Sequence, residues 1–274
     1  MSKKTLKQLK ESVKYLKKIY KKTPEAGIVL GSGLGKFTEE ITIEKEIPYA
    51  DIPHFPVSSV KGHQGKLIFG ELAGKKIVCM AGRFHFYEGY SSQEVVFPIR
   101  VLALLGIKTL LLSNAAGGVN TSFKVGDIML ITDHIGIDMV NPLLGKNIDE
   151  LGPRFPDMSQ PYKHSLIRKA KEIAVRLNIP VREGVYFGVT GPTYETRAEY
   201  RMILAMGGDA VGMSTVPECI AAIHMGVDVF AASVITDLGI RDEENVITHE
   251  EVLYHANAVE PKLSAIFTEL VASL

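Results

Sequence analysis

Short apolar runs alternate with segments of helical pattern along most of the chain. Runs rich in Val, Ile and Leu that end in Gly, Pro or polar residues are typical of buried strands. We predict strands at Ile28–Leu30, Leu67–Phe69, Ile77–Ala81, Thr109–Leu112, Ile128–Thr132, Gly184–Val189, Ala210–Met213 and Val229–Ile235. This alternation predicts an α/β fold with a central mixed β-sheet flanked by helices, and sites where loops leave the strand ends.

Helix starts are marked by a Ser or Thr followed three residues later by Glu, because the two side chains can cap each other's backbone N–H groups. The pairs are Ser91 and Glu94, Thr196 and Glu199, Thr215 and Glu218, and Thr248 and Glu251. Near the N-terminus, Lys3 to Lys22 carries Leu6, Leu9, Val13, Leu16 and Ile19 at helical spacing. Its lysines then form the solvated face of an amphipathic helix, and a targeting or tail-like segment is the alternative.

Composition supports one soluble domain. The 274 residues are 46% hydrophobic, which is enough for a substantial core in a single domain, residues 1–274. Thirty-one basic and 31 acidic residues give zero formal net charge, so neither a nucleic acid nor a membrane partner is expected. No signal peptide is recognisable, and no apolar run reaches the roughly 18 residues of a membrane span. Cys79 and Cys219 form no CxxC pair and fit reduced thiols, so we expect a cytoplasmic protein.

The first strand runs into a glycine-rich loop, Gly31-Ser32-Gly33-Leu34-Gly35. Glycine N–H groups and the Ser32 hydroxyl could hold an anion there. The loop fails the P-loop pattern, which needs Gly at Leu30 and Ser or Thr at Phe37, and it fails the dinucleotide fingerprint at Lys36. Alone, it is equally well read as a tight turn without a ligand.

Other predicted loops also carry residues suited to binding. The loop Gly82–Tyr90 offers Arg83 for phosphate and aromatic rings for a sugar or base, although Arg83 could instead form a surface ion pair with Glu88. Small residues follow at 113–118 and could lie against a flat ligand or make a packing turn. Ser214 and Thr215 stand at a helix start, where they could bind an anion or act only as caps. The last candidate loop is 235–239.

Taken together, six motifs in order resemble one family. GSGLG, GRFHFYEGY, NAAGG, RFPDMS, GPTYET and GMSTVPE are similar to the trimeric, low-molecular-mass class of purine nucleoside phosphorylases, from about Thr23 to the C-terminus. The resemblance implies a nucleoside phosphorylase fold and a homotrimer in which Phe155 reaches the neighbouring subunit's site. It implies no cofactor, since inorganic phosphate is a co-substrate. No metal is expected either, because the eight histidines supply no HExxH or other ligand spacing.

The resemblance also implies roles for individual residues. Phosphate would be bound by Ser32, His63, Arg83, His85, the backbone at Ala115, and Ser214. The ribose would be lined by Tyr87, Phe155, Tyr186, Met213 and His249. The purine would lie against Ala116, Tyr194, Glu195, Val211, Thr236 and Asp237. Catalysis would involve His85, Glu195 and Asp237. Two residues depart from the family pattern: Tyr194 stands where Phe is common, and Asp237 where Asn is common.

The chemistry of phosphorolysis agrees with these residue types. Cleavage of an N-glycosidic bond by phosphate passes through an oxocarbenium-like sugar while negative charge builds on the purine. A phosphate dianion held by Arg83, Ser32 and Ser214 offsets the cationic carbon and attacks it. A donor at purine N7, assigned to Asp237, would stabilise the leaving group.

The expected function is therefore reversible phosphorolysis of purine nucleosides to free purine and ribose 1-phosphate, as in purine salvage. Glu195 would accept the N1–H of a 6-oxopurine and so favour inosine and guanosine. An ionised Asp237 would favour a 6-amino group, but burial that keeps it protonated would let it donate to N7. The alternatives are a methylthioadenosine phosphorylase, which also has Asp at position 237 but lacks a glutamate like Glu195, a nucleoside-binding module without catalysis, and a hydrolase.

Overall fold

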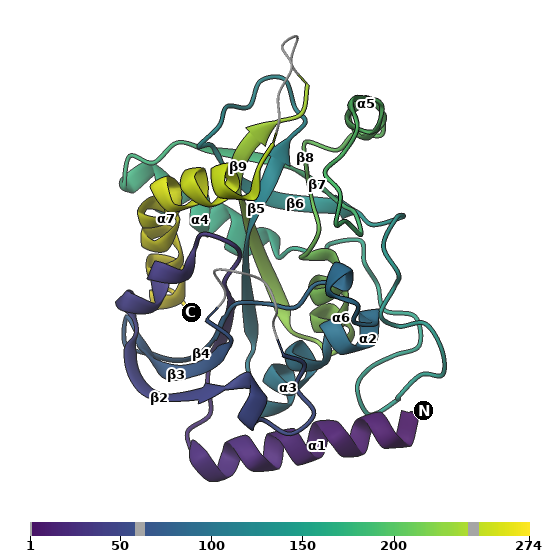
Figure 1. Cartoon of the computed structure of the whole chain (residues 1–274). Coiled ribbons are helices and arrows are strands. Elements are labelled where there is room, and N and C mark those ends of the chain that lie inside the picture. Colours follow the sequence, from purple (N-terminus) through teal and green to yellow (C-terminus); the bar gives the residue numbers. More distant parts are fainter. Residues whose placement is uncertain (1, 58–63, 241–246) are drawn as a thin grey trace.

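Nine strands form one mixed sheet in the computed structural model, which describes residues 2–57, 64–240 and 247–274. They are β1 (Ala26–Val29), β2 (Thr42–Pro48), β3 (Lys66–Leu72), β4 (Lys75–Ala81), β5 (Thr109–Gly118), β6 (Ile128–Ile135), β7 (Val181–Gly188), β8 (Ala210–Gly212) and β9 (Asp228–Leu238). Helices cover the sheet on both sides (Figure 1). The expected α/β fold with a central mixed sheet is confirmed.

The strand order is β2-β3-β4-β1-β5-β8-β7-β6-β9, and β9 also pairs with β5. That extra pairing closes the last five strands, β5, β8, β7, β6 and β9, into a ring. β1, β4 and β5 run parallel, whereas β2, β3 and β4 form an antiparallel meander. The ring places the ends of β5, β8 and β9 beside one another.

The helices are α1 (Ser2–Ile19), α2 (Ser92–Val95), α3 (Phe97–Leu105), α4 (His164–Arg176), α5 (Arg197–Ala205), α6 (Val216–His224) and α7 (His249–Ala272), with 3₁₀ turns η1 (Gly35–Glu40), η2 (Tyr49–Asp51) and η3 (Phe86–Glu88). The four predicted capping pairs all lie at helix starts, before α2, α5, α6 and α7. The pattern did not predict α4, because its start carries Lys163, whose side chain makes no capping hydrogen bond.

The first helix is amphipathic, as predicted. Leu9 and Leu16 are fully buried, and α1 packs on α3 at the edge of the molecule (Figure 1). The helix ends at Ile19, three residues earlier than the Lys3–Lys22 pattern indicated. Strand β2 was missed, because six of its seven residues are exposed and three adjacent ones, Glu44 to Glu46, are charged. Such a composition is typical of an edge strand, where charge discourages pairing with other chains.

Two segments predicted as loops are strand instead. Residues 113–118 continue β5, and residues 235–238 continue β9. The two strands pair in parallel over this whole length, with a register shift between Ala116 and Gly117. Small residues thus remain in the sheet because a neighbouring strand supplies their hydrogen bonds, which a local sequence pattern does not reveal.

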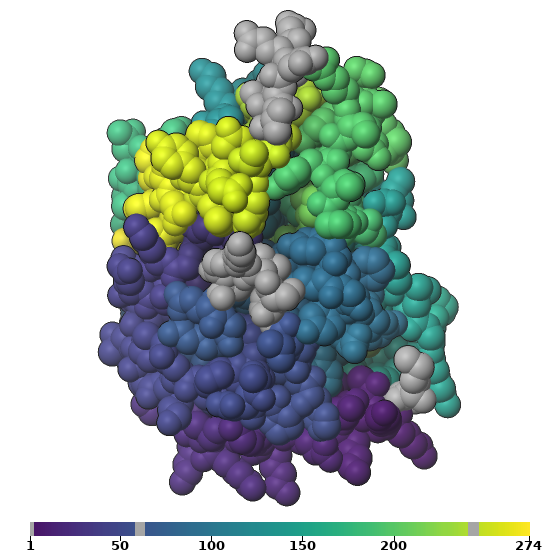
Figure 2. Space-filling model, in the orientation of Figure 1, coloured from purple at the N-terminus to yellow at the C-terminus, as the bar shows by residue number. Residues whose placement is uncertain are grey.

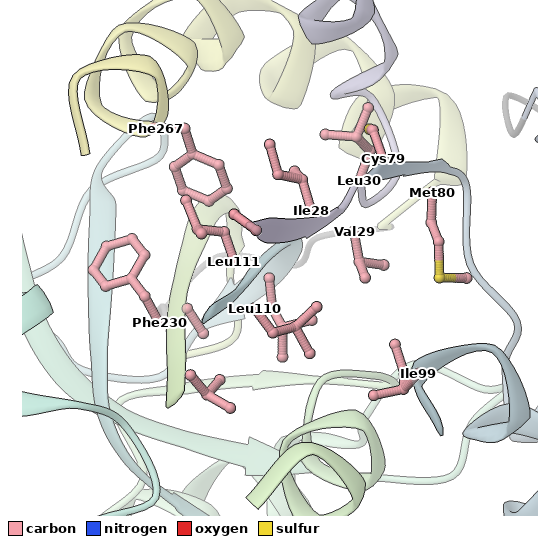
Figure 3. Close-up of a cluster of buried hydrophobic side chains, with 14 of the residues drawn as sticks. Ile28, Val29, Leu30, Cys79, Met80, Ile99, Leu110, Leu111, Phe230 and Phe267 are labelled. Carbon is pink, nitrogen blue, oxygen red and sulfur yellow. The ribbon is translucent and has the colours of Figure 1, made fainter. Parts of the chain in front are cut away.

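The main core lies where β1, β5 and β9 meet the covering helices (Figure 3). Ile28, Leu111 and Phe230 are fully buried there. Phe267 of α7 packs on Phe230 with ring centroids 5.8 Å apart. Each fully buried side chain of this size contributes about 1.5–3 kcal/mol, which fixes the sheet on which the site is built.

Candidate active site

A cavity of about 540 Å³ opens beside the ends of β5, β8 and β9. Figure 2 shows blue residues that follow β4, the green region of α5 and the yellow C-terminal helix meeting on this side of the molecule. Fourteen of the predicted residues line the cavity: Ser32, Arg83, His85, Tyr87, Ala115, Ala116, Tyr194, Glu195, Val211, Met213, Ser214, Thr236, Asp237 and His249. Residues from five of the six motifs, together with the end of β9 and the start of α7, therefore share one site.

Arg83 follows β4 directly and is only 1% exposed. Its Nε donates to Glu218 Oε1 at 2.9 Å, and its Nη1 donates to the Ser113 carbonyl at 2.5 Å and to Ser214 Oγ at 3.4 Å. The alternative of a surface ion pair between Arg83 and Glu88 is wrong. Arg83 is a buried cation held at the cavity wall by groups from β5 and α6.

Glu88 contacts His85 instead. Its Oε1 accepts from the His85 backbone N–H at 2.8 Å and lies 3.2 Å from His85 Nδ1. Burial lowers the pKa of His85, while the hydrogen bond with Glu88 acts against that shift. The Tyr87 ring stacks on the imidazole, with centroids 4.7 Å apart. Because burial is the largest effect, the neutral imidazole is favoured at the cavity wall.

The turn before α6 has a strained backbone. Thr215 is completely buried and has a φ of 68°, which is rare for a β-branched residue. Its hydroxyl accepts from Asn114 Nδ2 at 2.8 Å, and its N–H donates to Glu218 Oε2 at 2.7 Å. These contacts hold Ser214 at the cavity. Ser214 and Thr215 therefore do more than cap the helix.

Asp237 lies near the end of β9 with only 9% of its surface exposed. Thr236 Oγ1 donates to its Oδ1 at 3.0 Å. A Cβ atom at Gly117 would come within 3.0 Å of Asp237 Oδ2, so the absence of a side chain on β5 makes room for this carboxylate.

Glu195 lies in the same part of the cavity. Burial raises its pKa, a hydrogen bond from Tyr200 lowers it, and the nearby charge of Asp237 raises it further. The charge of Asp237 thus acts on the ionisation of Glu195 within one cavity. Tyr200 also lines the cavity, and sequence reasoning missed it because it belongs to the apolar pattern of α5.

Comparison with known proteins identifies the family. The model of the Phosphorylase superfamily matches residues 25–272. The chain belongs to the phosphorylase superfamily. It is 51% identical to purine nucleoside phosphorylase 1 of Geobacillus stearothermophilus over 89% of each chain. The expected family and pentosyltransferase activity are thereby confirmed.

Solved structures of the superfamily agree with this placement. Isoform 2 of purine nucleoside phosphorylase from Schistosoma mansoni, in complex with cytosine and ribose-1-phosphate, superimposes with a TM-score of 0.93 at 46% identity, covering 98% of this chain and 96% of that one. A Schistosoma mansoni purine nucleoside phosphorylase in complex with adenosine gives 0.93 at 42% identity, covering 98% and 97%.

Two predicted residues that the structure describes, Phe155 and Tyr186, do not line the cavity of this phosphorylase. Phe155 is 86% exposed, and the Arg154 guanidinium lies 5.4 Å from its ring centroid. Tyr186 is completely buried behind the cavity, where its hydroxyl accepts from the Ser214 N–H at 3.3 Å. Burial raises the pKa of Tyr186 to about 12. His63 lies outside the described residues.

Two further residues at this site were not assigned roles from the sequence. Asn114 lines the cavity and contacts Thr215, 101 positions later in the sequence. Glu218 lies behind the cavity and contacts Arg83, 135 positions earlier. Within residues 2–57, 64–240 and 247–274, no cluster of three or more His, Cys, Asp or Glu could hold a metal ion. None of the helices described is long and apolar enough to cross a membrane.

Proposed function

We propose that this phosphorylase cleaves purine nucleosides, mainly inosine and guanosine, with inorganic phosphate, giving the free purine and ribose 1-phosphate or its deoxy form. The observation that carries the proposal is that one cavity combines a buried cation, Arg83, with the buried carboxyl group of Asp237 and the half-buried one of Glu195. The cation suits a phosphate and the carboxyl groups suit the polar edge of a purine. The complexes of relatives with ribose-1-phosphate and with adenosine support the same assignment.

The phosphate would be bound by Arg83, His85, Ser32, Ser214 and the backbone of Ala115. A neutral His85 donates a hydrogen bond without adding charge, while Arg83 supplies the charge that a dianion needs. Held in this way below the sugar, the phosphate oxygen attacks C1′ as the oxocarbenium character develops.

The ribose would lie between the phosphate and the base, against Tyr87, Met213 and His249. The purine would lie against Ala116, Tyr194, Val211 and Thr236, with Glu195 accepting from N1–H and Asp237 at N7. The negative charge that builds on the leaving purine would be stabilised by a donor at N7.

The last part of the proposal concerns the oligomeric state. We assign Phe155 to the ribose site of a neighbouring subunit in a homotrimer, because a large apolar side chain that is 86% exposed is suited to a partner surface. The domain would comprise the whole chain, residues 1–274. It would need no cofactor and would serve purine salvage in the cytoplasm.

Initial rates with inosine, guanosine, adenosine and methylthioadenosine, with and without phosphate, test the proposal. Inosine and guanosine should be the best substrates, the reaction should require phosphate, and ribose 1-phosphate should be the product. Equal rates without phosphate would indicate a hydrolase, and binding without product would indicate a non-catalytic module. A preference for methylthioadenosine would favour the related phosphorylase that carries Asp at position 237.

A further inference from the structure

We infer that Glu218 is a positioning residue for phosphate, one that aligns Arg83 and the Ser214–Thr215 turn without touching the substrate. The inference rests on the proposed phosphate site. The Glu218 side chain does not line the cavity. It lies behind Ser214, which does. Its effect on phosphate must therefore pass through the groups that it holds.

Each carboxylate oxygen of Glu218 holds a different half of the site. Oε1 accepts from Arg83 Nε at 2.9 Å, and Oε2 accepts from the Thr215 N–H at 2.7 Å. Arg83 follows β4 and Thr215 precedes α6, so the Glu218 side chain ties the start of its own helix to a residue 135 positions earlier. Arg83 Nη1 in turn reaches Ser214 Oγ at 3.4 Å.

Because the ion pair between Arg83 and Glu218 is buried, each group depends on the other as its partner. The side chains of Arg83 and Glu218 are 1% and 3% exposed, so water cannot replace either partner. Only an ionised carboxylate offers acceptors on both oxygens, whereas a glutamine amide would turn its NH₂ group toward one of the two donors. Glu218 therefore provides both the charge and the geometry that hold Arg83.

The strained turn is a second reason to assign this role. Thr215 adopts a φ of 68°, a conformation that persists only where surrounding contacts enforce it. Its N–H is held by Glu218 and its hydroxyl by Asn114. Loss of the Glu218 contact would let this turn relax and carry Ser214 away from the phosphate.

Electrostatics alone gives the opposite expectation. A carboxylate near an anion site repels the anion, so replacing Glu218 by a neutral residue would strengthen phosphate binding if charge were the only effect. Positioning predicts weaker binding. The sign of the change in phosphate affinity therefore separates the two explanations.

Simple helix capping is a third explanation, and the chain contains a matched control for it. Glu94 has the same capping position in α2, where its Oε2 accepts from the Ser91 N–H at 2.8 Å. Glu94 is exposed, and no ion pair of it with an arginine is found among the described residues. A capping role alone would give Glu218→Gln and Glu94→Gln similar effects.

The experiment measures steady-state kinetics with inosine for wild type, Glu218→Gln, Glu218→Asp and Glu94→Gln, varying phosphate and nucleoside separately. It also measures the rise in unfolding temperature that phosphate produces. For both Glu218 variants we expect the phosphate KM to rise at least tenfold and the phosphate-induced rise in Tm to shrink, while the inosine KM changes less than threefold. Glu94→Gln should behave as wild type.

Several results would overturn the inference. An unchanged or lower phosphate KM in Glu218→Gln would favour charge or no role, and a loss confined to kcat would place Glu218 in another step. If neither Glu218 variant folds, the residue is structural rather than positioning. Failure of the proposed function is distinct, because it would appear in the wild type as a reaction that phosphate does not saturate.

Discussion

The Ser214 backbone N–H donates to the Tyr186 hydroxyl at 3.3 Å, so the buried phenol holds a residue that we propose binds phosphate. We predict that Tyr186→Phe leaves this N–H without its acceptor and raises the phosphate KM about two- to tenfold, the effect of one neutral hydrogen bond. The inosine KM should stay within twofold. Tyr162→Phe is the control, since it removes another completely buried hydroxyl, one that contacts His134. A rise in the inosine KM alone would return Tyr186 to the ribose site.

Arg83 allows a sharper test of the anion site. Arg83→Lys keeps the charge but loses the planar fork that contacts Glu218, Ser113 and Ser214 together. We expect the phosphate KM to rise more than tenfold, because hydrogen bonds to charged groups contribute about 1.5–3 kcal/mol. Arg100→Lys is the matched control, since Arg100 is also buried but contacts His224. Equal phosphate kinetics in both variants would contradict the assignment.

Local chemistry explains how much of the fold could be predicted. The capping pairs were predictable because a helix start is specified within four residues, as Thr196 and Glu199 illustrate. The continuation of β5 through Asn114 and Gly117 was not, because it depends on pairing with β9 more than a hundred residues later. Strand β2 was missed because its exposed, charged sequence lacks the apolar pattern of a buried strand.

The candidate site likewise has a part that the sequence predicts and a part that it does not. Motif residues such as Ser32 and Glu195 could be found from the sequence, because a family resemblance transfers positions one at a time. Contacts between motifs could not. Nothing local indicates that Glu218 holds Arg83, or that Asn114 donates to Thr215, since both relationships arise only when distant elements pack.

The raised pKa of Glu195 predicts an acidic limit to inosine cleavage. An ionised Glu195 is needed to accept N1–H, and burial makes it protonate at a higher pH than its usual value of 4.5. The kcat/KM for inosine should therefore begin to fall, as pH decreases, before an ordinary glutamate would protonate. The same shift affects stability with the opposite sign: the neutral form is favoured by folding, so this contribution is present at low pH and is lost as pH rises through the folded pKa.

The ratio of wild-type to Glu195→Gln kcat/KM across pH isolates this effect, because the titration of phosphate itself cancels. Glu195→Gln should reduce kcat/KM for inosine at least tenfold near neutral pH, as loss of a charged hydrogen bond predicts. The ratio should approach one at acidic pH. A ratio that is independent of pH would show that Glu195 ionisation does not control inosine use.

Phe155 tests the shared site. We predict that Phe155→Ala lowers kcat/KM for inosine at least tenfold without lowering Tm by more than a few degrees, because a side chain that is 86% exposed adds little to the fold of its own subunit. Mixing Phe155→Ala and Arg83→Lys subunits, followed by reassembly, should restore about a quarter of wild-type activity if each mixed trimer gains one complete site. Mixtures that stay as inactive as their components would refute a shared site.

Asp237 decides base choice in the last prediction. An ionised Asp237 accepts from a 6-amino group, and only its protonated form donates to N7, whereas an asparagine amide donates to N7 and O6 at every pH. Asp237→Asn should therefore suppress adenosine and lower the adenosine-to-inosine ratio of kcat/KM at least tenfold. The substitution also removes the charge that raises the pKa of Glu195, so Glu195 should stay ionised to lower pH and the acidic limit for inosine should move down. Both nucleosides should be measured with both proteins from about pH 5.5 to 8.5, where carboxyl groups with raised pKa values titrate. An unchanged ratio, or an acidic limit that stays in place, would mean that Asp237 neither selects the base nor acts on Glu195.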